Sequence, residues 1–270
     1  MLIAQITDLH IGDGPRSALN DARLDAVIER LSAAAPDVIL ATGDLIEDGG
    51  ARAYVRVADR LSSLGKTVLP VLGNHDVREA FVAAMGAPVN EGFVQYTAQV
   101  EDLRIIVLDT VEAGRHGGSF CDRRLAWLQT RLDEQPATPT LIALHHTPVR
   151  SGIAWMDDNA DGDWTLRLAA GLTGRDQVVG LVAGHLHRPM TTIFAGHPLV
   201  VAPSVAPAVV LDLDPGEMSR PEERPRIVEE DPGFALHRWT GGRLVSHFGT
   251  AGEHRTLASF DVSPRPPSAS

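Results

Sequence analysis

Residues 38–76 read VILATGDLIEDGGARAYVRVADRLSSLGKTVLPVLGNHD, and this stretch decides the fold. Two short apolar runs, at residues 38–42 and 67–72, flank a segment at 51–64 whose apolar residues recur at helical spacing. Short apolar runs that alternate with helical segments are typical of βαβ units, in which a crossover helix joins parallel strands. The stretch therefore predicts an α/β protein with a largely parallel sheet in this part of the chain.

The same alternation continues around this unit. A helix is expected at residues 19–34 and a short one at 77–85, and residues 93–109 read as a hairpin with its turn at 101–102. Strand and helix patterns therefore alternate through most of the first half of the chain.

The second half contains more closely spaced strands. A helix is expected at residues 122–132, with Asp122 or Ser119 as its N-cap, and a strand at 140–144. From residue 178 onward, strand-like runs with Gly-His and Gly-Gly turns predict an antiparallel meander. A parallel half followed by an antiparallel half indicates two sheets packed face to face with helices outside.

Length and composition indicate one domain. A chain of 270 residues with 44% hydrophobic content can bury one large core, which we place at residues 1–255. The Glu-, Arg- and Pro-rich segment at 214–232 is expected to be a surface excursion, and residues 256–270 a disordered tail. A single cysteine, Cys121, excludes an intramolecular disulfide and fits a reducing compartment.

Charge and hydropathy argue against two classes of partner. The formal net charge of -11 and the pI near 5.4 offer no basic surface for nucleic acid or anionic lipid. No apolar run approaches the ~20 residues of a membrane span, and the start MLIAQITDLH lacks the features of a signal peptide. We therefore expect a soluble cytoplasmic protein, which can still take a small anionic substrate through bound metal ions.

Five apolar runs end in polar residues able to hold a metal ion. Ligands of open α/β sheets bind at the carboxyl ends of the strands, so these residues predict one site built from distant parts of the chain. The runs LIAQITDLH, VILATGD, VLPVLGNHD, LIALHH and VGLVAGHLH supply Asp8, His10, Asp44, Asn74, His75, His145, His146, His185 and His187.

Spacing indicates which of these side chains converge. Residues two apart in an extended segment point the same way, so Asp8 and His10 could share an ion, as could His185 and His187. Either pair alone is more often an ordinary surface or core pair than a metal site. The presence of both pairs, with the other strand ends, favours metal.

Asp44 and Asn74 could each have a structural role that involves no metal ion. Asp44 could cap a helix, although the other motifs favour it as a ligand, and the missing side chain of Gly43 lets the backbone pass close to an ion. Gly-Asn is common in turns, but the amide oxygen of Asn74 suits a harder divalent ion. His145 and His146 are consecutive, so only one can easily face the metals; His145 is favoured, and His146 is left as a supporting, substrate-facing or packed residue.

The donor set suits two metal ions. Mixed nitrogen and oxygen donors without thiolates favour Fe, Mn, Zn or Co over Mg, Ca or a structural zinc site. One carboxylate, such as Asp44, can bridge two ions. Two ions about 3.5–4 Å apart lower the pKa of a shared water and polarise a phosphoryl group, so the set predicts hydrolysis of a phosphate ester.

The ordered motifs resemble those of the calcineurin-like metallophosphoesterase superfamily. They are D-x-H at residues 8–10, G-D at 43–44, G-N-H-D at 73–76, a histidine at 145 and G-H-x-H at 184–187. Within that superfamily, GRHGG before a WL-containing helix, HHTP and WMDDN are similar to segments of bacterial class III cyclic nucleotide phosphodiesterases and glycerophosphodiesterases.

This resemblance implies a four-layer αββα sandwich of two mixed β-sheets flanked by helices, with a dinuclear metal centre. It also implies that His75 contacts the phosphate together with Asn74, and that His75 either protonates the leaving oxygen or stabilises developing charge. The implied metal ligands are Asp8, His10 and His187 for one ion, Asn74, His145 and His185 for the other, and Asp44 as the bridge.

The leading prediction is a metal-dependent phosphodiesterase acting on a small diester, such as cyclic AMP or a glycerophosphodiester. A phosphomonoesterase and a non-catalytic metal-binding scaffold are the alternatives, and a homodimer is one option for its assembly. Residues 150–163, with Trp155 and Met156, could form a rim or lid over the leaving group, a subunit contact or a hydrophobic anchor. His116 is read as a turn histidine, and Asp109 as a structural or supporting residue.

Overall fold

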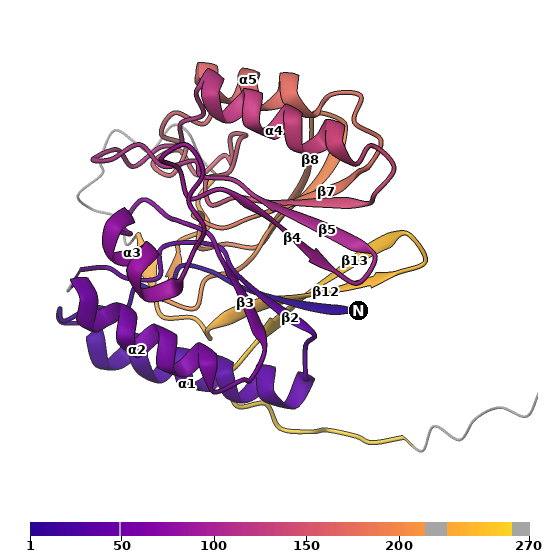
Figure 1. Ribbon diagram of the computed structural model, residues 1–270. Coiled ribbons are helices and arrows are strands. Elements are labelled where there is room, and N and C mark those ends of the chain that lie inside the picture. The colour runs from indigo at the N-terminus through magenta and orange to yellow at the C-terminus, as the bar shows by residue number, and fades with distance from the viewer. Residues whose placement is uncertain (49, 214–225, 261–270) are drawn as a thin grey trace, which may run out of the picture.

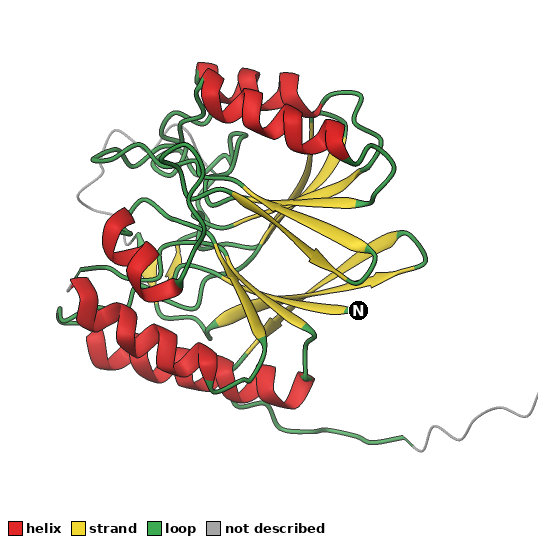
Figure 2. Cartoon of the chain, in the orientation of Figure 1, coloured by secondary structure: helices red, strands yellow, loops and turns green. Residues whose placement is uncertain are grey.

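Two β-sheets pack face to face at the centre of the protein, and helices cover the outer face of each (Figure 1 and Figure 2). The computed structural model describes residues 1–48, 50–213 and 226–260. The layers follow the order helix, sheet, sheet, helix, which confirms the αββα sandwich expected from the sequence. The part of the chain that the structure describes contains no helix long and apolar enough to cross a bilayer.

The first sheet combines strands from both ends of the chain. Its central strands are parallel, and its last two strands form a hairpin that pairs antiparallel to β1. The predicted meander is therefore wrong at its end, because these strands return to the first sheet. In spatial order the strands are β13 (Arg243–Thr250), β12 (Gly233–Thr240), β1 (Leu2–Ile6), β2 (Val38–Ala41) and β3 (Thr67–Pro70).

The second sheet is also mixed. The predicted hairpin is confirmed as the antiparallel pair β4–β5, but β7 pairs parallel to β9, while β8 turns back antiparallel at the edge. The meander prediction fails here too, because β9 and not β8 lies next to β7 in the sheet. The order is β4 (Tyr96–Val100), β5 (Leu103–Val107), β6 (Thr140–Ala143), β7 (Val178–Ala183), β9 (His197–Val201) and β8 (Met190–Phe194).

Two further strands, β10 (Ala208–Val209) and β11 (Ile227–Val228), form a small separate sheet. The predicted surface excursion at 214–232 and the predicted tail at 256–270 lie largely outside the described residues. Residues 256–260 are exposed and have no regular structure. The single-domain boundary at residue 255 stays a prediction.

Helices sit on the two outer faces (Figure 1). The predicted N-cap of α4 is wrong: Cys121 occupies that position in an extended conformation, and Ser119 accepts a hydrogen bond from Arg124 instead. The helices are α1 (Ser17–Ala34), α2 (Gly50–Ser62) and α3 (Arg78–Met85) on the first sheet, and α4 (Asp122–Glu134) and α5 (Asp163–Leu172) on the second.

Burial on both faces explains why the interior strands β2 and β7 are apolar along their whole length. Ile3 and Leu40 of the first sheet pack against Ile105 and Val182 of the second, and all four are inaccessible to solvent. The outer faces are covered in the same way by apolar residues of the helices. This packing holds the strand ends of both sheets at one edge.

A buried hydrogen-bond network crosses between the two sheets. Nε2 of His237 contacts Oε1 of Gln5 at 3.0 Å, and its Nδ1 contacts Oγ of Ser246 at 2.7 Å. The Gln5 amide of the first sheet donates to Oγ1 of Thr42, just after β2, and to the carbonyl of Ala183 in the second sheet. The network satisfies polar groups that the double-sheet core would otherwise leave unpaired.

The fold predicts one pH effect on stability. Burial lowers the pKa of His237 from 6.5 to about 4, so between these values the unfolded chain binds a proton that the folded chain does not. The stabilising contribution of neutral His237 to the folded state is present above pH 6.5 and is lost as the pH falls toward 4. The free energy of unfolding of the wild type should therefore fall as the pH is lowered from 7 to 5. Glutamine does not titrate, so we expect this fall to be smaller by about 2 kcal/mol in His237→Gln than in the wild type.

Urea unfolding of chelator-treated wild type and variant at the two pH values would measure this difference. Chelation removes metal binding from the comparison. An equal loss of stability in both proteins would contradict the expectation.

Candidate metal centre

The loops after β1, β2, β3, β6 and β7 meet at one edge of the sandwich. They bring together the residues that the sequence placed at five separate strand ends. Four overlapping groups of three side chains have ligand atoms within 4.8 Å of one another, and their members are Asp8, His10, Asp44, His75, His145, His146, His185 and His187. Asn74 joins them through His145.

The backbone at the site is not extended, contrary to the argument used for the D-x-H and H-x-H pairs. Asp8 and His10 have φ angles of 53° and 47°, and Asp44, His185 and His187 have 51°, 73° and 53°. Left-handed conformations cost energy in residues with a side chain and cluster at functional sites. Asp8 and His10 nevertheless share a group, as expected, whereas the other pair separates: His185 joins His145 and His146, and His187 joins Asp8 and His10.

Two glycines make room for the ligand loops. A Cβ on Gly43 would lie 2.3 Å from Nδ1 of His145, and one on Gly73 would lie 2.1 Å from the backbone nitrogen of Asp44. Gly43 therefore makes space for a histidine ring, where the sequence suggested a close approach to an ion.

The first group consists of Asp8, His10 and His187. Nε2 of His10 lies 3.0 Å from Nε2 of His187, which lies 3.5 Å from Oδ1 of Asp8. Nδ1 of His187 donates to the carbonyl of Pro207, so in the neutral ring Nε2 carries a lone pair. Oδ1 of Asp8 is buried and has no hydrogen-bond partner within the described residues. Donor atoms that face one another in this way fit a cation between them.

The second group is built around Asp44. Nε2 of His145 lies 3.3 Å from Oδ2 of Asp44 and 3.1 Å from Oδ1 of Asn74. Nδ1 of His145 donates to the carbonyl of Thr42, which leaves Nε2 of the neutral ring free to bind an ion. The same Asp44 oxygen lies 3.8 Å from Nε2 of His10. One carboxylate oxygen thus lies between the two groups.

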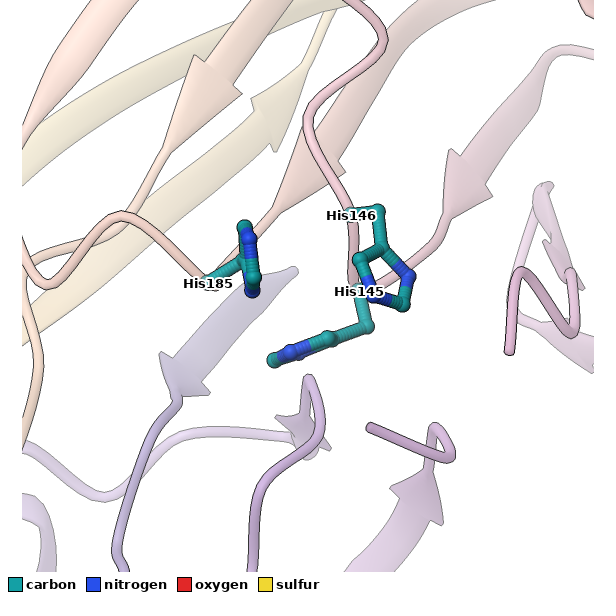
Figure 3. A group of neighbouring side chains, drawn as sticks. All are labelled: His145, His146 and His185. Atoms are coloured by element: carbon teal, nitrogen blue, oxygen red, sulfur yellow. The ribbon is translucent and has the colours of Figure 1, made fainter. Parts of the chain in front are cut away.

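The third group shows that both consecutive histidines approach the site (Figure 3). The ring of His146 lies 4.9 Å from that of His145 and 4.8 Å from that of His185. β6 ends at Ala143, so the alternation of a strand does not separate the two rings, and the preference for His145 over His146 as a ligand stays a prediction. Nδ1 of His146 contacts Oγ1 of Thr110 at 2.8 Å and Nε2 contacts the carbonyl of His116 at 3.0 Å, so both of its ring nitrogens are engaged by other protein groups.

The pKa values of the candidate ligands show which of them carry a proton that a metal ion would have to displace. Burial lowers the pKa of His145, but the Asp44 carboxylate outweighs burial and raises it to about 9. Burial would raise the pKa of Asp44, but His145 holds it well below its usual value. Binding of a metal ion to this pair must therefore compete with binding of a proton to His145. Burial lowers the pKa of His185 and His187, which keeps both rings neutral as ligands require.

A family model described as "Calcineurin-like phosphoesterase" matches residues 1–189. The chain belongs to this family. The resemblance read from the ordered motifs is thereby confirmed, and the donor groups above occupy the edge where the five motifs meet.

Named relatives of this phosphoesterase include two diesterases. The chain is 35% identical over 250 residues to a "probable cyclic nucleotide phosphodiesterase" of Rhodopseudomonas palustris, with 86% of this chain and 89% of the relative covered. It is 29% identical to a "probable glycerophosphodiester phosphodiesterase GpdQ" of Arcobacter nitrofigilis, with 89% of each covered. A crystal structure of a dimetal phosphatase from Danio rerio shares the fold, with a TM-score of 0.67 at 16% identity over 94% of this chain and 97% of that one.

Two carboxylates near the centre of this phosphoesterase were not singled out by sequence. Asp76 accepts hydrogen bonds from the backbone of Leu45 and Gly73 and from the Tyr54 hydroxyl, which ties the loops after β2 and β3 together. Oε2 of Glu47 lies 2.5 Å from Nδ1 of His10. The position of Glu47 just after the G-D motif could have suggested that it lies near the site. The direction of its side chain, however, depends on the conformation of the loop.

Glu47 also approaches the histidine of G-N-H-D. Its Oε2 lies 3.4 Å from Nδ1 of His75, so one carboxylate contacts both His10 and His75. The hydrogen bond from His10 lowers the pKa of Glu47 to about 2. A carboxylate that binds Nδ1 of a metal-ligating histidine directs the Nε2 lone pair toward the ion.

We expect Glu47→Gln to weaken metal binding or turnover by about ten-fold, because the neutral amide orients His10 less strongly. Metal titration and turnover of a chromogenic diester would measure both effects. Asp48→Asn is a matched control, because its carboxylate contacts the backbone of Asp13 and neither histidine. Equal behaviour of the two variants would show that Glu47 does not orient the site.

A pocket opens onto the metal groups. Its polar side includes His75 and His116, and the ring of His116 lies 4.7 Å from that of His185. His116, read as a turn histidine, therefore also lines the site. Asp109 lies apart from the metal groups and binds Arg78 and backbone amides, as a structural residue would.

Proposed function

We propose that this chain is a metal-dependent phosphodiesterase that hydrolyses a small phosphodiester. The observation that carries the proposal is the convergence of Nε2 of His10 and Nε2 of His145 on one Asp44 oxygen, together with the buried Oδ1 of Asp8, which has no hydrogen-bond partner within the described residues. The names of the two diesterase relatives support a cyclic nucleotide or a glycerophosphodiester as the substrate.

We assign the two groups to two ions, with Fe, Mn, Zn or Co as the candidates from the donor types. When bound, such ions activate water and polarise a phosphoryl group. The ligands are Asp8, His10 and His187 for one ion, Asn74, His145 and His185 for the other, and Asp44 for both.

His75 is the residue assigned to the substrate. Its side chain is 34% exposed, lines the pocket and is held by Glu47. Its backbone nitrogen donates to Oδ1 of Asp44 at 2.9 Å, which fixes its position next to the proposed bridge. From there the ring can contact a phosphate and protonate a leaving oxygen or stabilise developing charge, while Asn74 lies beside it as a second substrate contact.

We also propose a cellular compartment and a kind of substrate for this protein. A reducing cytoplasmic environment suits the single cysteine, and the acidic chain suits a small substrate better than nucleic acid. A homodimer remains one option for its assembly.

The test compares bis(4-nitrophenyl) phosphate with 4-nitrophenyl phosphate on protein loaded with Mn or Fe. We expect faster turnover of the diester. A strong preference for the monoester would make the protein a phosphomonoesterase. Failure to bind metal and to hydrolyse either ester would make it a scaffold.

A further inference from the structure

One side of the pocket is not used by the proposed hydrolysis. It is formed by residues without a charged or amide side chain, which we call the apolar wall. The apolar wall consists of Trp155, Met156, Ala206, Pro207, Val209 and Ile227. It lines the same pocket as the ligand histidines.

The apolar wall is held in place before any ligand binds. Met156 is 5% exposed and packs with the core of the second sheet. The loop that carries it is tied by Asp157, which accepts hydrogen bonds from the backbone of Ser151 and Gly152 at 2.7 and 3.0 Å. The guanidinium of Arg226 lies 5.5 Å from the centre of the Trp155 ring.

The apolar wall is also connected directly to the metal groups. The carbonyl of Pro207 accepts the hydrogen bond from Nδ1 of His187, at 2.9 Å. From Pro207 the chain continues into β10, which pairs with β11 through Val209 and Ile227. A phosphate held at the metal groups would therefore have its substituent next to a flat aromatic ring and aliphatic side chains.

We propose that the apolar wall binds the base of a nucleoside phosphodiester, with the indole of Trp155 as the stacking surface. This inference rests on the proposed phosphodiesterase function and narrows its substrate class. The faces of a nucleobase are flat and apolar, and they stack on aromatic side chains. A glycerophosphodiester would place hydroxyl groups against side chains that cannot bind them, which costs affinity.

The first test uses metal-loaded protein with cyclic AMP and glycerophosphoethanolamine as substrates. Trp155→Leu removes the aromatic ring but keeps apolar bulk, and we expect kcat/KM for cyclic AMP to fall about ten-fold. The value for glycerophosphoethanolamine should change less than about two-fold. Trp155→Phe keeps an aromatic face and should retain most of the activity toward cyclic AMP.

The second test measures binding without turnover. In calorimetry, 5′-AMP should bind about ten-fold more tightly than ribose 5-phosphate to the wild type, because only AMP carries a base. This ratio should fall toward one in Trp155→Leu and persist in Trp155→Phe. Ile227→Ser should lower it in the same direction; Ile227 is 42% exposed, so the change spares the core, whereas Ile193→Ser on the distant edge strand β8 should leave it unchanged.

Equal affinity for the two phosphates in the wild type, or an equal effect of Trp155→Leu on both diesters, would overturn the inference. A wild type that prefers glycerophosphoethanolamine would do the same and leave the phosphodiesterase proposal standing. If the loaded wild type hydrolyses no diester, the proposed function fails, while the binding ratio still tests the apolar wall.

Discussion

Replacement of Asp44 by alanine is expected to abolish phosphodiester hydrolysis and to lower the occupancy of both metal ions. Its Oδ2 lies 3.3 Å from Nε2 of His145 and 3.8 Å from Nε2 of His10, which belong to different groups. Removal of the shared oxygen leaves each group one donor short. We expect the rate to fall by more than about a hundred-fold, since loss of a mere supporting residue already costs up to that much.

Elemental analysis of the purified variant and turnover of bis(4-nitrophenyl) phosphate would measure the two effects. Asp44 is buried and binds the backbone of His75, so circular dichroism must first show that the variant folds. Asp44→Asn provides a matched comparison, because it keeps one oxygen of nearly the same shape but loses the charge. Retention of two ions per chain in Asp44→Ala would refute the bridging assignment.

The second large effect is expected for His75→Ala. Its ring is 4.7 Å from that of His10 and is partly exposed at the pocket, which suits a residue that contacts substrate. Loss of a proton donor or charge-stabilising group costs about 10²–10⁴-fold in rate. We expect turnover to fall by this factor while both metals remain bound.

The metal content of His75→Ala separates the two possible roles of this histidine. One of its ring nitrogens lies within 4.8 Å of ligand atoms of His10 and Asp44, a distance range that also suits a ligand. Loss of one ion would therefore make His75 a metal ligand. Retained activity would remove it from both roles.

Residue order along the chain was enough to predict the fold class and the members of the site. Alternating strand and helix patterns around residues 38–76 predict parallel strands, and the polar residue at the end of each run is a local feature. The five motifs also identify the family, because their order and spacing are properties of the linear chain. Helix and strand bounds were close for the same reason.

Sheet membership of the last strands could not be obtained in this way. β12 and β13 read as a continuation of a meander, yet β12 pairs with β1, more than 200 residues earlier in the sequence, and β13 pairs with β12. Strand propensity describes a segment, whereas pairing depends on which sheet edge is free once the core has formed. The parallel pairing of β7 with β9 was missed for the same reason.

The sequence by itself determined which donor types meet at the strand ends, since ligand chemistry is carried by residue identity. Only the tertiary structure decided how these donor residues divide between the metal groups. Left-handed turns at Asp8 and His185, and not strand alternation, direct the side chains, and other protein groups engage both ring nitrogens of His146. The orientation of Glu47 could not be predicted from the sequence, which suggested Trp155 and Met156 as a possible rim but none of the other residues of the apolar wall. Side-chain direction depends on backbone dihedrals and contacts that exist only when loops from two sheets pack together.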